Sequence, residues 1–155
     1  LAQICKYIEE CTGEPTNIYY SIENNAVGEA AIVSLAEYGE SNIPGTMLSE
    51  AGKKRKGFNT TQKSKLAACA KFKTLLESKK MTINSRSLVS ELKSFVASGG
   101  SYAAKVGDTD DLVMATILAV RMMQQLQSYH SEMDQQMKDH GDIIIEPMPF
   151  IASFN

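Results

Sequence analysis

The chain has 155 residues, 43% of them hydrophobic and 22% charged, which is an ordinary composition for one globular domain. Sixteen Lys and Arg against 18 Asp and Glu give a net charge of -2, so any contact with nucleic acid must depend on local patches. The 3 cysteines form no C-x-x-C pair, which argues against a disulfide framework or a zinc site and favours a reducing compartment. No apolar stretch has the length of a membrane span, so we expect an intracellular protein without a membrane role.

Helices and strands are predicted to alternate along the chain. Helical spacing over residues 1–12 ends at Gly13, and the aromatic, β-branched run 17–24 predicts a strand. The next predicted elements, in chain order, are a helix over 25–38 that ends at Gly39, a short strand within 43–50, a helix over 61–80 capped by Thr60 or Thr61, a strand over 81–84, a helix over 85–98, a strand over 101–106 and a helix from about Asp108 to beyond Leu126. This alternation predicts an α/β fold.

We expect a single domain over residues 1–155, with its core in 1–127 and a helix extension and tail in 128–155. The tail is polar and then interrupted by prolines, which is untypical of a core. The chain starts without a methionine and with helical periodicity already under way, so we expect it to be a segment of a longer protein.

The stretch "KVGDTDDLVMATILAV" places three acids directly before an apolar run. One Asp at a helix start is explained by the free backbone N–H groups, and we assign that capping role to Asp108. Asp110 and Asp111 add charges that repel one another by about 0.3–1 kcal/mol each, so capping alone does not require them. The apolar run predicts a buried helix, and acids fixed at its start are suitable oxygen ligands for a divalent cation. Taken alone, however, an acidic helix start is more often only a cap.

A second acid strengthens the metal hypothesis. In "NIYYSIENN", Glu23 ends an otherwise apolar strand, which is where α/β sheets place ligand chemistry. A Glu at a strand end combined with an Asp at a helix start is typical of a metal site. The alternative is that Glu23 is a solvated residue at the edge of the sheet.

These motifs, in the order "YYSIENNAVGEAA", "QKSKLAACAKFKTLLESKKMTINSRSLVSELKSF" and "GSYAAKVGDTDDLVMATILAV", resemble the nuclease domain of the large terminase subunit of tailed bacteriophages. The resemblance is closest to the contractile-tailed branch and covers about residues 1–125. It implies an RNase H-like mixed sheet flanked by helices, and a metal-dependent endonuclease that cuts concatemeric double-stranded DNA during packaging. The family's acidic ligands correspond to Glu23 and Asp111 as catalytic and metal-binding residues, with Asp110 as a further ligand or orienting group.

The resemblance also implies the cofactor and what this chain lacks. Phosphodiester hydrolysis of this kind uses two Mg²⁺ or Mn²⁺ ions about 3.5–4 Å apart. The family's first-strand Asp would lie upstream of Leu1, and the chain contains no G-x-x-x-x-G-K-[ST] motif of an ATPase. We therefore expect the two-ion site only when the upstream Asp is present, and little cutting by this chain alone. A sheet without its first strands exposes edges, so self-association is expected. Thr109 stands where the motif often has His, which leaves that residue's proton-transfer role in doubt here.

Contact with DNA phosphates is expected from a basic loop and the helix after it. The predicted contacts are Lys53, Lys54, Arg55, Lys56, Lys63 and Lys65. The alternative is that these are solvated lysines. The family resemblance implies the phage portal and the small terminase subunit as further partners, and the host-cell cytoplasm as the location. Two other functions stay open: a non-catalytic DNA-holding or partner-docking module, and a resolvase or transposase-type nuclease of the same fold.

Overall fold

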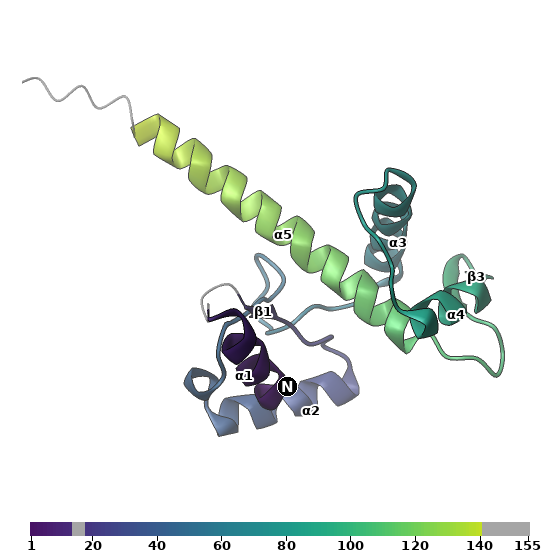
Figure 1. The fold of residues 1–155 in the computed structure, drawn as a ribbon, viewed down its shortest axis with the longest axis horizontal. Coiled ribbons are helices and arrows are strands. Elements are labelled where there is room, and N and C mark those ends of the chain that lie inside the picture. Colours follow the sequence, from purple (N-terminus) through teal and green to yellow (C-terminus); the bar gives the residue numbers. More distant parts are fainter. Residues whose placement is uncertain (14–17, 141–155) are drawn as a thin grey trace, which may run out of the picture. The chain divides into compact units, whose positions relative to one another are not determined.

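The computed structural model describes residues 1–13 and 18–140, with side chains described as far as residue 129. It divides into two compact units, Leu1–Gln125 and Leu126–Asn155. The first unit contains every element except the end of the last helix (Figure 1). Within the described residues, no helix is both long enough and apolar enough to cross a membrane.

The chain is a mixed α/β fold built from helices and short strands. Its elements are α1 Ala2–Thr12, β1 Tyr19–Tyr20, α2 Ala26–Tyr38, the 3₁₀ turn η2 Glu40–Asn42, β2 Thr46–Met47, α3 Gln62–Glu77, α4 Arg86–Ser94, β3 Phe95–Ser98, β4 Ser101–Ala104 and α5 Asp111–His140. The helix ends follow the local sequence. Gly13, at φ 69°, ends α1, Asn25 caps α2, and Thr61 caps α3 through a reciprocal capping box with Ser64.

Two small sheets are present among the described residues. Strand β1 pairs in parallel with β2, and β3 pairs antiparallel with β4. Beyond β1 the chain stays extended, and Glu23 forms a parallel bridge with Phe58. One extended segment therefore borders first β2 and then the residues that follow the basic loop.

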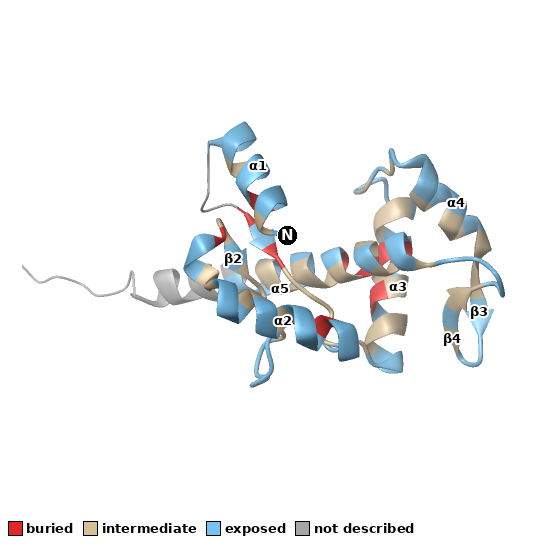
Figure 2. Cartoon of the chain, turned by 90° about the horizontal axis from the view of Figure 1, so that it is seen from below, coloured by how far each residue is buried: buried red, intermediate tan, exposed pale blue. Residues whose placement is uncertain are grey.

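Buried side chains form two clusters, and Figure 2 marks the buried positions in red. The N-terminal cluster joins α1 to the first sheet and consists of Cys5, Ile18, Tyr20 and Ile43. The C-terminal cluster joins α3 to α5 and consists of Ala68, Val113 and Ile117, with apolar residues of α4 and β3 packed against it. Each cluster supports one of the two segments that carry the predicted acids.

Two of the predicted elements are wrong. Residues 81–84 form no strand, since no other described segment pairs with them. The helix predicted over 85–98 stops at Ser94, and its last four residues become β3. The cause is the Gly99–Gly100 pair, whose φ values of 57° and 79° suit a tight two-residue turn between antiparallel strands.

Two predictions about the last helix also need correction. Helix α5 begins at Asp111, and Asp108 lies in the preceding turn, where its N–H donates to the Lys105 carbonyl at 3.0 Å. Asp108 is therefore not the cap. The helix also does not bury its whole circumference. Val113, Ile117 and Val120 form one buried stripe, whereas Leu112 on another face is 41% exposed.

Candidate active site

Backbone contacts fix the position of Glu23. The Phe58 N–H donates to the Ile22 carbonyl at 3.0 Å, and the Asn24 N–H donates to the Phe58 carbonyl at 2.8 Å, so Glu23 is held between two ladder bonds. The Asn25 side-chain amide donates to the Glu23 carboxylate at 3.1 Å. Gly28, in the first turn of α2, packs so closely on the Glu23 carbonyl that a Cβ there would overlap it. Glu23 is half-buried, with its backbone fixed by Phe58 and Gly28 and its carboxylate oriented by Asn25.

A side chain from another helix fixes the start of α5. The Glu91 carboxylate of α4 accepts from the Leu112 N–H at 2.8 Å and from the Val113 N–H at 3.2 Å. Its other oxygen accepts from the Thr109 hydroxyl at 3.2 Å. A carboxylate at this position satisfies free N–H groups and the positive end of the helix dipole. Glu91 therefore performs the capping that the sequence assigned to Asp108.

Glu91 supplies the cap, whereas Asp110 and Asp111 at the helix start have different surroundings. Asp110 is half-buried and lies 3.8 Å from the Lys65 ammonium of α3. Lys65 also lies over the Phe95 ring, 5.4 Å from its centre, and its side chain is only 16% exposed. Asp111 is exposed. Lys65 therefore offsets part of the charge that the paired acids bring to this helix end.

The predicted acids from the two segments meet at one pocket of about 400 Å³. Glu23, Asp110 and Asp111 line it together with Thr60 and residues from one face of α5, including Arg121. Within the part of the chain that the structure describes, no group of three or more His, Cys, Asp or Glu is arranged to hold a metal ion. Mg²⁺ at phosphate-processing sites commonly takes one or two carboxylates, with waters and substrate oxygens completing its shell. The donors in the pocket match that chemistry, and the metal assignment stays a prediction.

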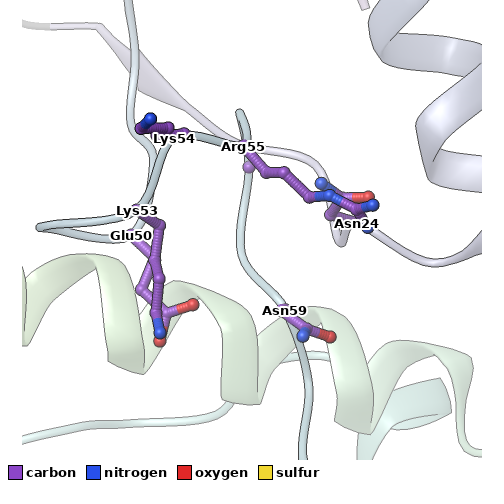
Figure 3. Close-up of a pocket in the computed structure, with 7 residues that line it drawn as sticks. Asn24, Glu50, Lys53, Lys54, Arg55 and Asn59 are labelled. Atoms are coloured by element: carbon purple, nitrogen blue, oxygen red, sulfur yellow. The ribbon is translucent and has the colours of Figure 1, made fainter.

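The basic loop lines a second, smaller pocket of about 200 Å³. Figure 3 shows Arg55 extending toward Asn24, next to Glu23 in the chain, while Lys54 lies on the other side of the loop. The Asn24 side-chain amide donates to the Lys56 carbonyl at 2.9 Å. The predicted phosphate contacts at Lys53, Lys54 and Arg55 are thus attached to the segment that carries Glu23.

The other predicted DNA contacts have different surroundings. Lys56 forms an ion pair with Glu40, and Lys65 forms one with Asp110. Lys63 is exposed on α3. Lys65 lies next to the acids, whereas Lys56 belongs to the basic loop. Contact of these six residues with DNA stays a prediction.

Sequence reasoning missed two residues that organise this region. Glu91 lies 21 positions before the N–H group of Leu112 that it accepts from, and no local pattern reveals such a cap. Arg121 looks like an ordinary polar interruption of an apolar helix, although its side chain is only 11% exposed. A buried charge requires partners, so an Arg inside an apolar run was the one signal available.

The chain is a mixed α/β fold in which Glu23, beyond the end of β1, and the acids at the start of α5 line one pocket. Residues 2–123 match the family model described as the terminase RNaseH-like domain. The chain therefore belongs to this family, so the family resemblance and the predicted α/β, RNase H-like fold class are confirmed. The match does not show the contractile-tailed branch, which stays a prediction.

Proposed function

We propose that this terminase RNaseH-like domain is a metal-dependent endonuclease module that cuts concatemeric double-stranded DNA, with Glu23 and Asp111 as its catalytic carboxylates. The observation that carries the proposal is that Glu23, Asp110 and Asp111 line the same pocket, although Glu23 and Asp111 are 88 positions apart in the sequence. Glu91 supplies the side-chain cap of α5, and Glu23 lies in an extended bridge to Phe58 rather than at a helix start, so capping does not account for Glu23 or require Asp111. The membership of the terminase family supports the same reaction.

The residues of the pocket have distinct tasks in this proposal. Glu23 and Asp111 would hold Mg²⁺ or Mn²⁺, with Asp110 as a further ligand or orienting group. The bound ion would stabilise charge on the scissile phosphate and lower the pKa of the attacking water. The Asn25 amide keeps the Glu23 carboxylate oriented, and Glu91 keeps the start of α5 in place. Lys65 limits the repulsion between Asp110 and an approaching phosphate.

DNA enters the proposal through the basic loop. Its cations would hold backbone phosphates without reading sequence, so the cleavage should tolerate many sequences. The net charge of -2 means that this attraction is local and should weaken steeply with salt. The portal, the small terminase subunit and the host-cell cytoplasm remain proposed partners and location.

The test compares Glu23→Ala and Asp111→Ala with the matched control Asp108→Ala. Asp108 is an acid of the same segment that does not line the pocket, so it controls for charge. Nicking is measured on the domain extended by the upstream Asp-bearing strand that the family resemblance implies, because little cutting is expected of residues 1–155 alone. We expect Mn²⁺-dependent nicking of plasmid to fall by at least about 100-fold in the two pocket variants, more than the loss of a supporting group costs. The control should stay within about twofold of the unaltered protein, because it removes no ligand.

Calorimetric titration with Mn²⁺ gives a readout that does not require activity. The affinity should drop in both pocket variants and stay unchanged in Asp108→Ala. Equal nicking by all four proteins would refute the site assignment. DNA binding that persists without any nicking or metal affinity would instead favour the non-catalytic DNA-holding module.

A further inference from the structure

The basic loop is closed at its base by its own backbone. The chain leaves the edge of β1 after Leu48, whose N–H donates to the Tyr20 carbonyl, and returns at Phe58. Between them, the Glu50 N–H donates to the Gly57 carbonyl at 3.1 Å, and the Gly57 N–H donates to the Ser49 hydroxyl at 2.9 Å. Residues 49–50 and 57–59 therefore form two adjacent legs that carry the cations of residues 53–56.

Two side chains of α5 hold both legs. The Gln125 side-chain amide donates to the Ser49 carbonyl at 2.6 Å. Arg121 lies 3.5 Å from the Glu50 carboxylate on the first leg, and its Nη2 donates to the Asn59 carbonyl on the second leg at 3.2 Å. Figure 3 shows the Glu50 side chain extending from the loop toward α5.

The Arg121 side chain is enclosed by its neighbours. Its guanidinium lies over the Phe58 ring at 5.0 Å, and its side chain is 11% exposed. Arg121 and Gln125 are four residues apart and so project from the same face of the helix. The Arg121 Nη1 is buried and has no hydrogen-bond partner among the described residues, which is an unfavourable arrangement that needs a reason to persist. The Arg121 Nη2 makes both the Glu50 and the Asn59 contact, so one nitrogen joins the two legs.

We propose that Arg121 and Gln125 are positioning residues that fix the basic loop on α5, at a set distance from the acids that begin the same helix. This inference rests on the proposed function, since it assigns the loop to DNA and the acids to cleavage. Asp111 and Arg121 are ten positions apart, which is about 15 Å of helix axis. The helix thus acts as a rigid spacer between the phosphates that the loop holds and the phosphate that is cut. Misplacing either end costs rate, because hydrolysis requires precise orientation.

Trypsin reports the position of the loop directly, since residues 53–56 offer four consecutive cleavage sites. Gln125→Ala removes one hydrogen bond without changing charge and should speed cutting in the loop by about fivefold. Arg121→Gln should speed it by about tenfold or more, and Arg121→Lys should fall between these and the unaltered protein. Cutting after Lys79 and Lys80, which follow α3, should not change and serves as the internal control. Thr116→Ala is the matched control variant, because this half-buried residue lies on the same helix and its hydroxyl donates to the Leu112 carbonyl of that helix.

The result that overturns the inference is equal cutting of the loop in Gln125→Ala and the unaltered protein. Equal acceleration at the loop and at Lys79 and Lys80 also overturns it, because that pattern reports general unfolding. The affinity for a DNA duplex in EDTA should fall by about threefold in Gln125→Ala, since loop cations act together only when their positions are fixed. Failure of the nuclease proposal has a different signature: no metal-dependent nicking by the domain extended with the upstream Asp-bearing strand, with the trypsin pattern intact.

Discussion

The two halves of the acid pocket are built by different means. On the N-terminal side, Glu23 is placed by main-chain bonds to Phe58 and by the close approach of Gly28. On the C-terminal side, Asp110 and Asp111 are placed by one side chain, Glu91, which binds the start of α5 from another helix. The Glu23 half depends on Gly28 having no side chain, whereas the Asp111 half depends on the side chain of Glu91.

This difference predicts how each half fails. A backbone bridge can be displaced only by steric overlap, and the surrounding cluster of Cys5, Ile18, Tyr20 and Ile43 leaves the strand little room to move. A capping carboxylate can be removed without overlap, after which water takes its place at the exposed helix end. Damage to the Glu23 side should therefore be large and structural, whereas damage to the Asp111 side should be smaller and local.

The largest effect is expected for Gly28→Ala. In a helix this change ordinarily stabilises by about 1 kcal/mol. Here the new Cβ would overlap the Glu23 carbonyl, so the sign should reverse and the free energy of unfolding should drop by about 2 kcal/mol or more. Urea denaturation measures this, and Mn²⁺ affinity should fall with it because Glu23 is displaced.

The control for Gly28→Ala is its neighbour Val27→Ala, since Val27 is 80% exposed. That change should alter stability by no more than about 0.5 kcal/mol. A stable Gly28→Ala variant would mean that the backbone approach at Glu23 is not a constraint, and the contrast between the two halves would disappear.

Glu91→Ala should have an intermediate effect. It removes acceptors for the Leu112 and Val113 N–H groups and for the Thr109 hydroxyl, so we expect a loss of about 1–2 kcal/mol of stability. Glu91→Gln retains an acceptor oxygen and should lose less. Hydrogen exchange at the first turn of α5 should increase in Glu91→Ala while the amides of α2 stay protected.

Glu77→Ala makes the same change of charge at an exposed site of α3 and is the matched control. Its ion pair with Lys73 lies at 3.7 Å with both side chains exposed, so removing it should cost about 0.5 kcal/mol or less. If Glu91→Ala were as mild as Glu77→Ala, the helix start would not depend on Glu91.

The sequence predicted the elements whose signals are local. Helix α1 ends at Gly13 and α2 at Gly39, as expected, because a glycine that accepts positive φ ends a helix without help from distant residues. Local signals fail for the strand wrongly predicted at 81–84 and for residues 95–98, which the sequence pattern assigns to a helix. Both depend on whether a partner strand is available, and the Gly99–Gly100 turn supplies one only for the second.

The sequence predicts the acids of the candidate site but not the residues that position them. Glu23 and Asp111 stand out because a charge beside an apolar run is unusual. The residues that bring them to one pocket act across the fold: Phe58 is 35 positions from Glu23, and Glu91 caps a helix that starts 20 positions later. No periodicity encodes such contacts, so the meeting of the two segments could be expected only from the family resemblance.

The smallest expected effect is a dependence of stability on pH, to which a different titrating residue contributes in each of the two buried clusters. Burial, followed by the nearby Glu40 and Cys5, raises the pKa of Tyr20 above its ordinary 10.0 in the N-terminal cluster. Burial, opposed by Lys65, raises the pKa of the Cys69 thiol above its ordinary 9.0 beside the C-terminal cluster. In each case the unfolded chain releases the proton first, so rising pH favours unfolding.

The contribution of these two groups to the free energy of unfolding should be constant below about pH 9 and should then fall as Cys69 and later Tyr20 titrate. Cys69→Ala should remove the earlier part of the decline and Tyr20→Phe the later part, as measured by urea denaturation between about pH 7 and 11. A decline of unchanged shape in both variants would show that neither cluster holds its titrating group in the protonated state, and the two regions would then respond to alkali alike.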